Sequence, residues 1–304
     1  MKNKKRFYVK LFCWVLIAGI SFYVCTFGVA TIKESENLFK QEKTQTVISI
    51  WHVETFEGGK KPRIDFLKSV AKEIESKHDD LLFMIKSVKP ENLASELEVN
   101  SPDIISFGYG VGKIVLPFLT NFTTTFNARD ELVSSGMFNN KLFAVPYMVG
   151  GYSIFNHTAN ATNFYVGSNS YVHPERIYEK MNLKPLETQT QFEAYKNFVN
   201  DKNSCLLGST RDLFRVNNLN SIGRLSAMIS PVDSYTDLIQ YLGVVNSNKH
   251  TLNFVDKCLS FNRQNKLVDY ALFSSLSHKL YNEGIYNDME NAILNADIPN
   301  VFYD

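Results

Sequence analysis

The chain has 304 residues, a formal net charge of +1 and 44% hydrophobic residues. This length and hydrophobicity suffice for one large domain or two moderate ones, and they exclude a disordered chain. The near-neutral charge argues against nucleic acid as the main partner.

The N-terminus has the composition of an export signal or a membrane anchor. Basic residues gather in the first ten positions, at Lys2, Lys4, Lys5, Arg6 and Lys10, and no residue from 11 to 32 is charged. About 20 apolar residues can span a bilayer, and the basic flank predicts that the rest of the chain lies outside the cell. Residues 28–30 offer a signal-peptidase site. We expect residues 1–40 to form a signal peptide or an anchor with its tether, and both alternatives stay open.

The first half of the remaining chain alternates between strand and helix patterns. Apolar or β-rich runs predict strands over 47–51, 81–85 and 103–107, the second of them as a buried parallel strand. Between the first two, Pro62 and apolar residues at helical spacing predict a helix, and Pro90 opens a shorter one. This order predicts a parallel sheet with right-handed crossovers.

The second half is less regular. Strands are expected over 142–146 and 204–207, and residues 156–170 are expected to be loop because Asn, Thr, Ser and Gly dominate them. Helices are expected over 192–199, 252–261, 267–272, 276–285 and 289–294.

Cysteine and histidine spacing gives no metal or cofactor signal. Cys205 and Cys258 lie in the exported part, where a disulfide and two buried free thiols are both possible. The six histidines are scattered, and no cluster has metal-ligand spacing. We therefore predict no metal and no cofactor.

Several segments, in their order, resemble the extracellular solute-binding proteins of bacterial ABC importers, in the sugar-binding group that includes maltose-binding protein. They are Ile50-Trp51-His52 with Glu57-Gly58-Gly59, residues 102–108, residues 144–148 with Gly150-Gly151-Tyr152, residues 207–212, and the turn at 246–248 with the helix after it. The resemblance covers most of residues 47–270. It implies an α/β fold of the type II periplasmic-binding-protein kind, with two lobes and a cleft between them.

The resemblance also implies the lobe boundaries and the function. The first lobe would comprise residues 41–148 and 241–270, and the second, which is shorter than usual in this family, residues 149–240 and 271–304. The implied function is extracellular capture of a small polar solute, a sugar or oligosaccharide, by lobe closure. The implied partners are this carbohydrate, an ABC transporter permease, and the membrane through the N-terminal segment.

The positions of the strand ends point to candidate ligand-binding residues independently of the resemblance. In an open parallel sheet, ligands bind beyond the carboxyl ends of the strands. Aromatic rings suit the C–H face of a sugar, and charged groups suit its hydroxyl rim. The candidates are Trp51, His52, Glu57, Tyr109, Tyr147, Tyr152, Arg211 and Asp212.

Four of these candidates also have structural alternatives that the sequence leaves open. Trp51 could instead close the core of its lobe, and Glu57 could be a solvated loop carboxylate. Arg211 and Asp212 could form an interlobe or intrahelical ion pair, with Arg215 competing for Asp212.

Two other functions remain open at this point. One is a sensor or interaction module of the same fold that does not serve transport. The other is a membrane-anchored glycoside hydrolase, which would need two carboxylates facing one sugar, drawn from Glu54, Glu57 and Asp103. The sequence has no Gly-x-Ser-x-Gly, His-Glu-x-x-His or phosphate-loop motif, so we do not predict an enzyme.

Overall fold

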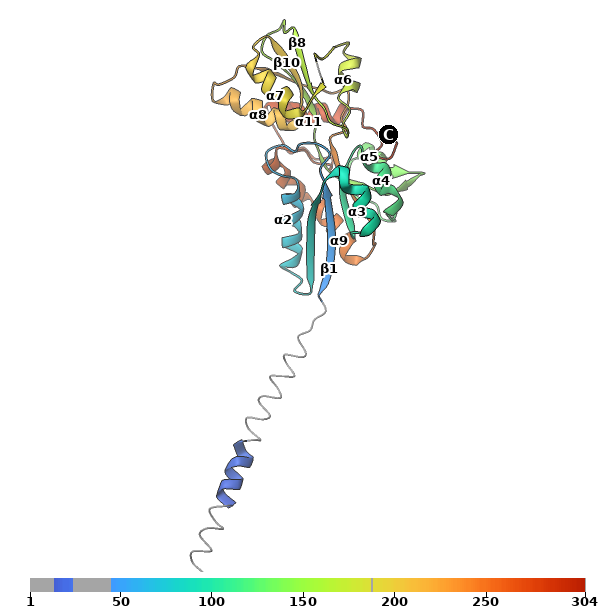
Figure 1. The fold of residues 1–304 in the computed structure, drawn as a ribbon, viewed down its shortest axis with the longest axis vertical. Helices are drawn as coiled ribbons and strands as arrows, with labels where there is room; N and C mark the ends of the chain where they lie inside the picture. Colours follow the sequence, from blue (N-terminus) through green and yellow to red (C-terminus); the bar gives the residue numbers. More distant parts are fainter. Residues whose placement is uncertain (1–13, 24–44, 187, 304) are drawn as a thin grey trace, which may run out of the picture. The chain divides into compact units, whose positions relative to one another are not determined.

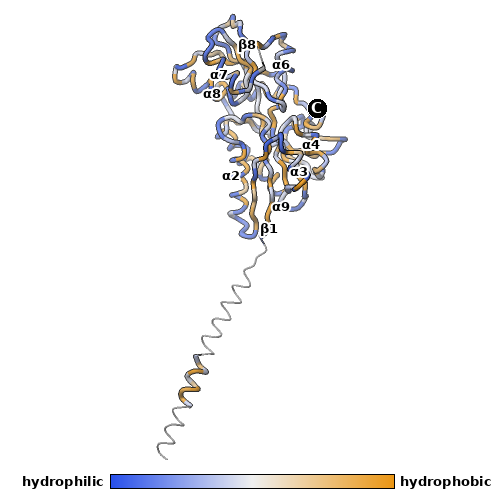
Figure 2. Tube along the Cα trace, viewed as in Figure 1, coloured by the Kyte–Doolittle hydropathy of each residue, from blue (hydrophilic) through white to orange (hydrophobic). Residues whose placement is uncertain are grey.

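A computed structural model describes residues 14–23, 45–186 and 188–303. The chain divides into two units, Met1–Thr46 and Val47–Asp304. In the first unit, residues 14–23 form an exposed helix that is hydrophobic along its length (Figure 2). Among the described residues, no helix has both the length and the apolar character needed to cross a membrane. The predicted cleavage site at 28–30 lies outside the described residues.

The second unit contains a five-stranded sheet near its N-terminal end (Figure 1). Its strands, in spatial order, are β2 (Leu81–Val88), β1 (Thr46–Val53), β3 (Ile104–Gly108), β12 (Ile239–Val244) and β6 (Val145–Val149). β1 and β3 are parallel, as predicted, but β12 is antiparallel to both β3 and β6. The sheet is therefore mixed, and its antiparallel strand β12 comes from the part of the chain that follows the second sheet.

Alternation along β1 sends its side chains to two different helical layers. Ile48 and Ile50 pack with α2 (Ile64–Glu75) and α9 (Lys249–Cys258), whereas Trp51 and Val53 belong to the core on the opposite side. α10 (Phe261–Gln264) and η3 (Asn265–Tyr270) lie on the side of α2 and α9, because Leu267 and Tyr270 belong to the same core and Arg263 bonds Glu73 of α2. The elements on the opposite side or at the sheet margins are η1 (Pro90–Asn92), α3 (Leu93–Val99), α4 (Gly112–Val115), η2 (Leu116–Phe118), α5 (Asp130–Ser135), β4 (Met137–Phe138) and β5 (Lys141–Leu142). We call this sheet with its helices the first lobe.

A second five-stranded sheet forms the other part of the unit. Its strands, in spatial order, are β11 (Met228–Pro231), β7 (Tyr152–Asn156), β10 (Ser204–Ser209), β8 (Asn163–Gly167) and β9 (Thr188–Gln189). β10 is central and fully buried, parallel to β8 and antiparallel to β7. The accompanying helices are α6 (Glu175–Lys180), α7 (Gln191–Asn200), α8 (Thr210–Ser221) and α11 (Gly284–Asn295). We call this sheet with its helices the second lobe.

The chain passes between the lobes four times. It leaves the first sheet between β6 and β7, returns between β11 and β12, and leaves again after η3 to form α11. After α11 it returns once more: Val301 N donates to Ser135 O at 2.9 Å, and the Phe302 and Phe107 rings lie 6.3 Å apart. The predicted boundaries place these last residues in the second lobe, although they pack against the first. The predicted two-lobed α/β fold is confirmed.

Two predictions about strands were wrong. Residues 81–85 are not buried on both faces, because β2 is an edge strand whose Leu82 and Met84 side chains are exposed. Residues 156–170 are not all loop, because they contain β8. The alternation of buried Phe164 and Val166 with less buried neighbours is a strand pattern that the polar flanks concealed.

The helix predicted over 276–285 was also wrong. This stretch is irregular, and α11 begins only at Gly284. The buried Glu290 carboxylate accepts hydrogen bonds from the backbone N–H groups of Leu280 and Tyr281, which a helix would otherwise satisfy. Of the two cysteine alternatives, the free thiols are observed: Cys205 and Cys258 are buried, unbridged and in different lobes.

Candidate functional site

Trp51 lies inside the first lobe. It stands within β1 rather than beyond its end, because the strand continues to Val53. Only 5% of Trp51 is exposed, and the Lys86 Nζ lies 5.0 Å from its ring centroid. The alternative of a core position is therefore the observed one.

His52 and Tyr147 belong to a buried polar network centred on Ser106. Ser106 Oγ lies 2.9 Å from His52 Nδ1 and 2.8 Å from the Tyr147 hydroxyl, and it accepts a hydrogen bond from Gln240 Nε2 at 2.9 Å. Burial lowers the pKa of His52, so the ring is neutral in this interior. The network joins β1, β3, β6 and β12 and fixes the first sheet from within.

Tyr152 belongs to a second buried network, where the chain returns between the lobes. Its hydroxyl donates to Asp237 Oδ1 at 2.7 Å, and Asp237 Oδ2 accepts from the His173 backbone N–H at 2.6 Å. Burial raises the pKa of the Asp237 carboxyl. Asp237 was not among the predicted site residues, although a carboxylate directly before the apolar run of β12 was a usable signal.

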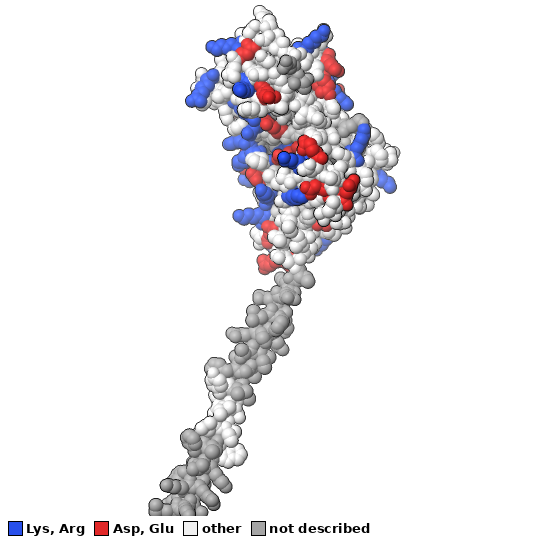
Figure 3. Space-filling view, viewed as in Figure 1, with Lys and Arg blue, Asp and Glu red and all other residues white. Residues whose placement is uncertain are grey.

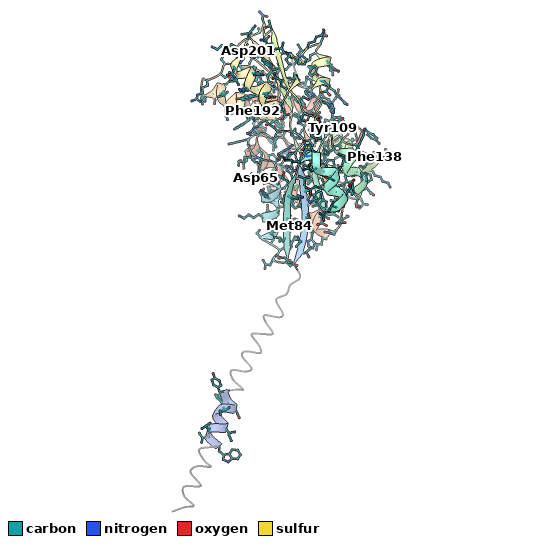
Figure 4. The ribbon with its side chains drawn as sticks, in the orientation of Figure 1. Asp65, Met84, Tyr109, Phe138, Phe192 and Asp201 are labelled. Carbon is teal, nitrogen blue, oxygen red and sulfur yellow. The ribbon has the colours of Figure 1, made fainter. Side chains whose placement is uncertain are left out.

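Tyr109 lies where the two lobes meet, just beyond the end of β3 (Figure 4). Its ring packs edge-on against His173 of the second lobe, with centroids 5.6 Å apart. Beside it, Gly110 has a positive φ of 82°, and a methyl group there would lie 2.6 Å from Tyr171 Cα. The Asn169 amide also donates to Thr55 O at 3.0 Å. The lobes are therefore in direct contact on this side.

Arg211 joins the lobes on another side. Its Nη1 donates to the backbone oxygens of Gly59 at 2.5 Å and Lys60 at 3.2 Å. In the next turn of α8, Arg215 Nη1 lies 3.1 Å from Glu57 Oε2. Arg211 and Arg215 of the second lobe thus both contact the loop that follows β1 in the first.

The start of α8 positions these arginines. Ser209 and Asp212 form a capping box at the start of this helix. Ser209 Oγ accepts a hydrogen bond from the Arg211 backbone N–H at 3.2 Å, and Asp212 Oδ2 accepts one from the Ser209 backbone N–H at 3.0 Å. Asp212 is buried and also lies 3.2 Å from Arg215 Nη1, so the predicted ion-pair alternative is observed. Burial raises the pKa of Asp212 to about 6, against the opposing effect of Arg215.

A cavity of about 220 Å³ lies where Arg211 meets the first lobe. We call it the interlobe cavity. Its lining residues are Glu54, Glu57, Gly58, Lys60, Lys61, Pro62, Arg63 and Arg211. Figure 3 shows Lys and Arg gathered along the left edge of the globular part, where α2 and the loop before it lie in Figure 1.

The interlobe cavity contains two of the eight predicted site residues, Glu57 and Arg211. The other six contribute to lobe interiors or to contacts elsewhere. Lys60, Lys61 and Arg63 were not among the predicted site residues, although three basic residues closely following a glycine pair were a visible signal. In the part of the chain that the structure describes, no three His, Cys, Asp or Glu side chains gather as metal ligands.

Solved structures share this fold, although no protein-family model and no curated protein matches the sequence. One is the GacH receptor of Streptomyces glaucescens, also solved with acarbose, with a TM-score of 0.61 and 11% identity over 84% of this chain and 87% of that one. Another is the galacto-N-biose/lacto-N-biose I-binding protein of the ABC transporter from Bifidobacterium longum, with a TM-score of 0.56 and 12% identity over 84% and 87%. A third, described as a two-component system protein that mediates signal transduction, has a TM-score of 0.57 and 14% identity over 84% and 97%. The fold is that of sugar-binding extracellular solute-binding proteins.

Proposed function

We propose that this protein captures a small polar solute, a sugar, between its two lobes on the outside of the cell. The observation that carries the proposal is the interlobe cavity, to which Arg211 of the second lobe and the loop after β1 in the first both contribute. Its volume of about 220 Å³ is below the range of roughly 300–1,000 Å³ typical of drug-sized ligands, so it suits a solute of monosaccharide size.

Capture would proceed by opening and closing of the lobes. In the open form, the bonds from Arg211 and Arg215 to the loop after β1 are broken and the cavity is accessible to solvent. Binding of the solute favours the closed form and removes the solute from water. No bond is broken in the solute. The closed form would then deliver the solute to an ABC transporter permease, with the N-terminal segment holding the protein at the membrane.

Thermal unfolding in the presence of a sugar panel tests this proposal. A solute that binds only the folded state raises Tm by mass action. Replacing Arg211 by Ala should reduce the shift produced by the binding sugar, because the variant loses the side chain that closes the cavity. The matched control is R224A, which removes an exposed arginine of the same lobe that does not line the interlobe cavity. An unchanged shift in R211A would contradict the assignment of the site.

A sensor or interaction module of the same fold is a second candidate. It is favoured by the direct contacts between the lobes and by the burial of Trp51, Tyr147 and Tyr152, which leaves these rings outside the cavity. If no sugar or other small polar solute shifts Tm, this second function replaces the first. A glycoside hydrolase would instead release product from labelled oligosaccharides.

A further inference from the structure

The interlobe cavity has an excess of positive charge. Its lining contains four cationic side chains, Lys60, Lys61, Arg63 and Arg211, and two carboxylates. Glu57 is paired with Arg215, 3.1 Å away. Glu54 lies 3.2 Å from the neutral ring of His52 and keeps its negative charge, so the four cations still outnumber the carboxylates. None of the four cations has a carboxylate within ion-pair distance among the described residues.

Arg63 is the most unusual of these cations. Only 1% of it is exposed, its guanidinium stacks 3.8 Å from the Phe56 ring centroid, and Nη2 donates to Phe56 O at 2.5 Å. Its Nε and Nη1 are buried with no hydrogen-bond partner among the described residues. Burial lowers the pKa of the Arg63 guanidinium, and the charge of Glu54, which lies beyond ion-pair distance, partly opposes this effect. The two unbonded donors carry a desolvation cost, so an acceptor beside them would be stabilising.

Arg129 provides a comparison, because it is also a buried arginine whose Nε and Nη1 atoms have no hydrogen-bond partner among the described residues. Arg129 is 6% exposed, and its Nη1 lies 3.4 Å from Glu131 Oε1. Arg129 therefore has a carboxylate within ion-pair distance, whereas Glu54 acts on Arg63 only from beyond that distance, and Arg63 lines the interlobe cavity. The N-terminus of α2, at which Arg63 is the cap residue, also lacks a side-chain cap and adds positive potential there.

We propose that the solute captured in the interlobe cavity is a sugar acid, whose carboxylate is held by Arg63 with Lys60 and Lys61 at the mouth and Arg211 closing from the second lobe. The proposal rests on the proposed function and specifies its substrate class. An Arg–carboxylate pair has two parallel hydrogen bonds, which would occupy donors that are otherwise vacant. The sugar hydroxyls would then face Glu54 and Glu57, which accept hydrogen bonds.

The test compares sugar acids with their neutral parents on the full chain. The probes are glucuronate, galacturonate and gluconate, matched with glucose, galactose and glucitol, and inorganic phosphate. Binding is measured by calorimetry and by Tm at constant ionic strength. We expect at least one acid to bind at least about tenfold more tightly than its parent, because a hydrogen-bonded charge pair is involved.

Variants of Arg63 locate the effect. R63M should lose about tenfold or more in acid binding, R63K should recover part of it, and R224M should bind as the wild type does. If R63M does not fold, the exposed pair K60M/K61M tests the same site, and the same preference for acid should weaken.

The outcomes separate this inference from the proposed function. A neutral sugar that binds as tightly as its acid, with R63M unaffected, would overturn the sugar-acid assignment and leave sugar capture intact. Phosphate binding in place of the acids would also overturn it. If no sugar of either series binds, the proposed function itself fails.

Discussion

Ser106 of β3 connects three other strands in the interior of the first lobe. Its hydroxyl is completely buried and has three polar neighbours, on β1, β6 and β12. A sequence offers little sign of such a role, because a serine in an apolar strand is compatible with many environments. The partners lie 41 to 134 residues away along the chain.

Replacing Ser106 by Ala should lower the free energy of unfolding by about 3 kcal/mol, because His52, Tyr147 and Gln240 would each lose a buried hydrogen-bond partner. Urea unfolding measures this change. The control is S95A, which removes an exposed hydroxyl that donates to the backbone oxygen of Asn92 and should change stability by less than about 0.5 kcal/mol. Equal effects in the two variants would show that the network contributes nothing.

Asp212 should give the stability of the protein a pH dependence of definite sign. The folded state holds the Asp212 proton more tightly than the unfolded chain, because its pKa is raised from 3.8 to about 6. Ionisation of Asp212 therefore opposes folding, so its contribution to the free energy of unfolding falls as pH rises from about 4 to about 6 and is constant above. The two pKa values correspond to a difference of about 3 kcal/mol.

D212N removes this titration while keeping an acceptor for the Ser209 N–H. Urea unfolding between pH 4 and pH 7 should therefore show a flatter profile for D212N than for the wild type. D233N, which replaces an exposed carboxylate, should follow the wild-type profile. A wild-type slope retained in D212N would refute this assignment.

At the scale of elements, the sequence predicted best those helices whose apolar residues recur with a clear period. α2, α7 and α9 were placed within a few residues, since each buries one face against a sheet. The aromatic residues at strand ends were placed less well as site residues. The alternation of side chains in β1 decides which face of the sheet Trp51 occupies. The residues that cover this face come from elements distant in sequence, so the sequence alone could not decide whether Trp51 is buried.

Gly58 and Gly59, which follow β1, differ in how closely backbone atoms of other segments approach them. A methyl group on Gly59 would lie 2.3 Å from Tyr270 O and 2.4 Å from Ala271 O, both backbone atoms. A methyl group on Gly58 would lie 3.1 Å from Arg63 Cγ, a side-chain atom. Only Gly59 therefore sits where backbone segments approach too closely for any side chain.

G59A should destabilise the protein by about 3 kcal/mol, and G58A by about 1 kcal/mol, because a backbone clash cannot be relieved by rotating a side chain. Thermal or urea unfolding of the two variants provides the comparison. G59A should also weaken solute binding, since Gly59 O is an acceptor for Arg211. Similar stabilities for G58A and G59A would contradict the packing described for this loop.

At the scale of the molecule, the two-lobed fold could be predicted from an ordered set of segments, but the fit between the lobes could not. The contacts of Arg211 and Arg215 with the loop after β1 join residues that are more than 150 positions apart. Glu57 and Arg211 were predicted because each stands in a turn after a strand. Arg63 was not, because a basic residue at the start of a helix is usually solvated.

The last residues should stabilise the whole unit through Phe302. This side chain is 2% exposed and packs against Phe107, Phe138 and Phe143 of the first lobe. F302A should lower the free energy of unfolding by about 3 kcal/mol, whereas Y303A, at a position 56% exposed, should change it little. Calorimetric unfolding distinguishes the two, and an equally mild F302A would show that this segment is dispensable.

The central position of β12 in the first sheet also affects the order of events during biosynthesis. β3 and β6 flank this strand, yet it is made only after nearly all of the second sheet has left the ribosome. A nascent chain therefore cannot finish its first core early and fold one half at a time, as many multidomain proteins do. Such a delay would suit a polypeptide that is threaded through a translocation channel before it acquires tertiary structure.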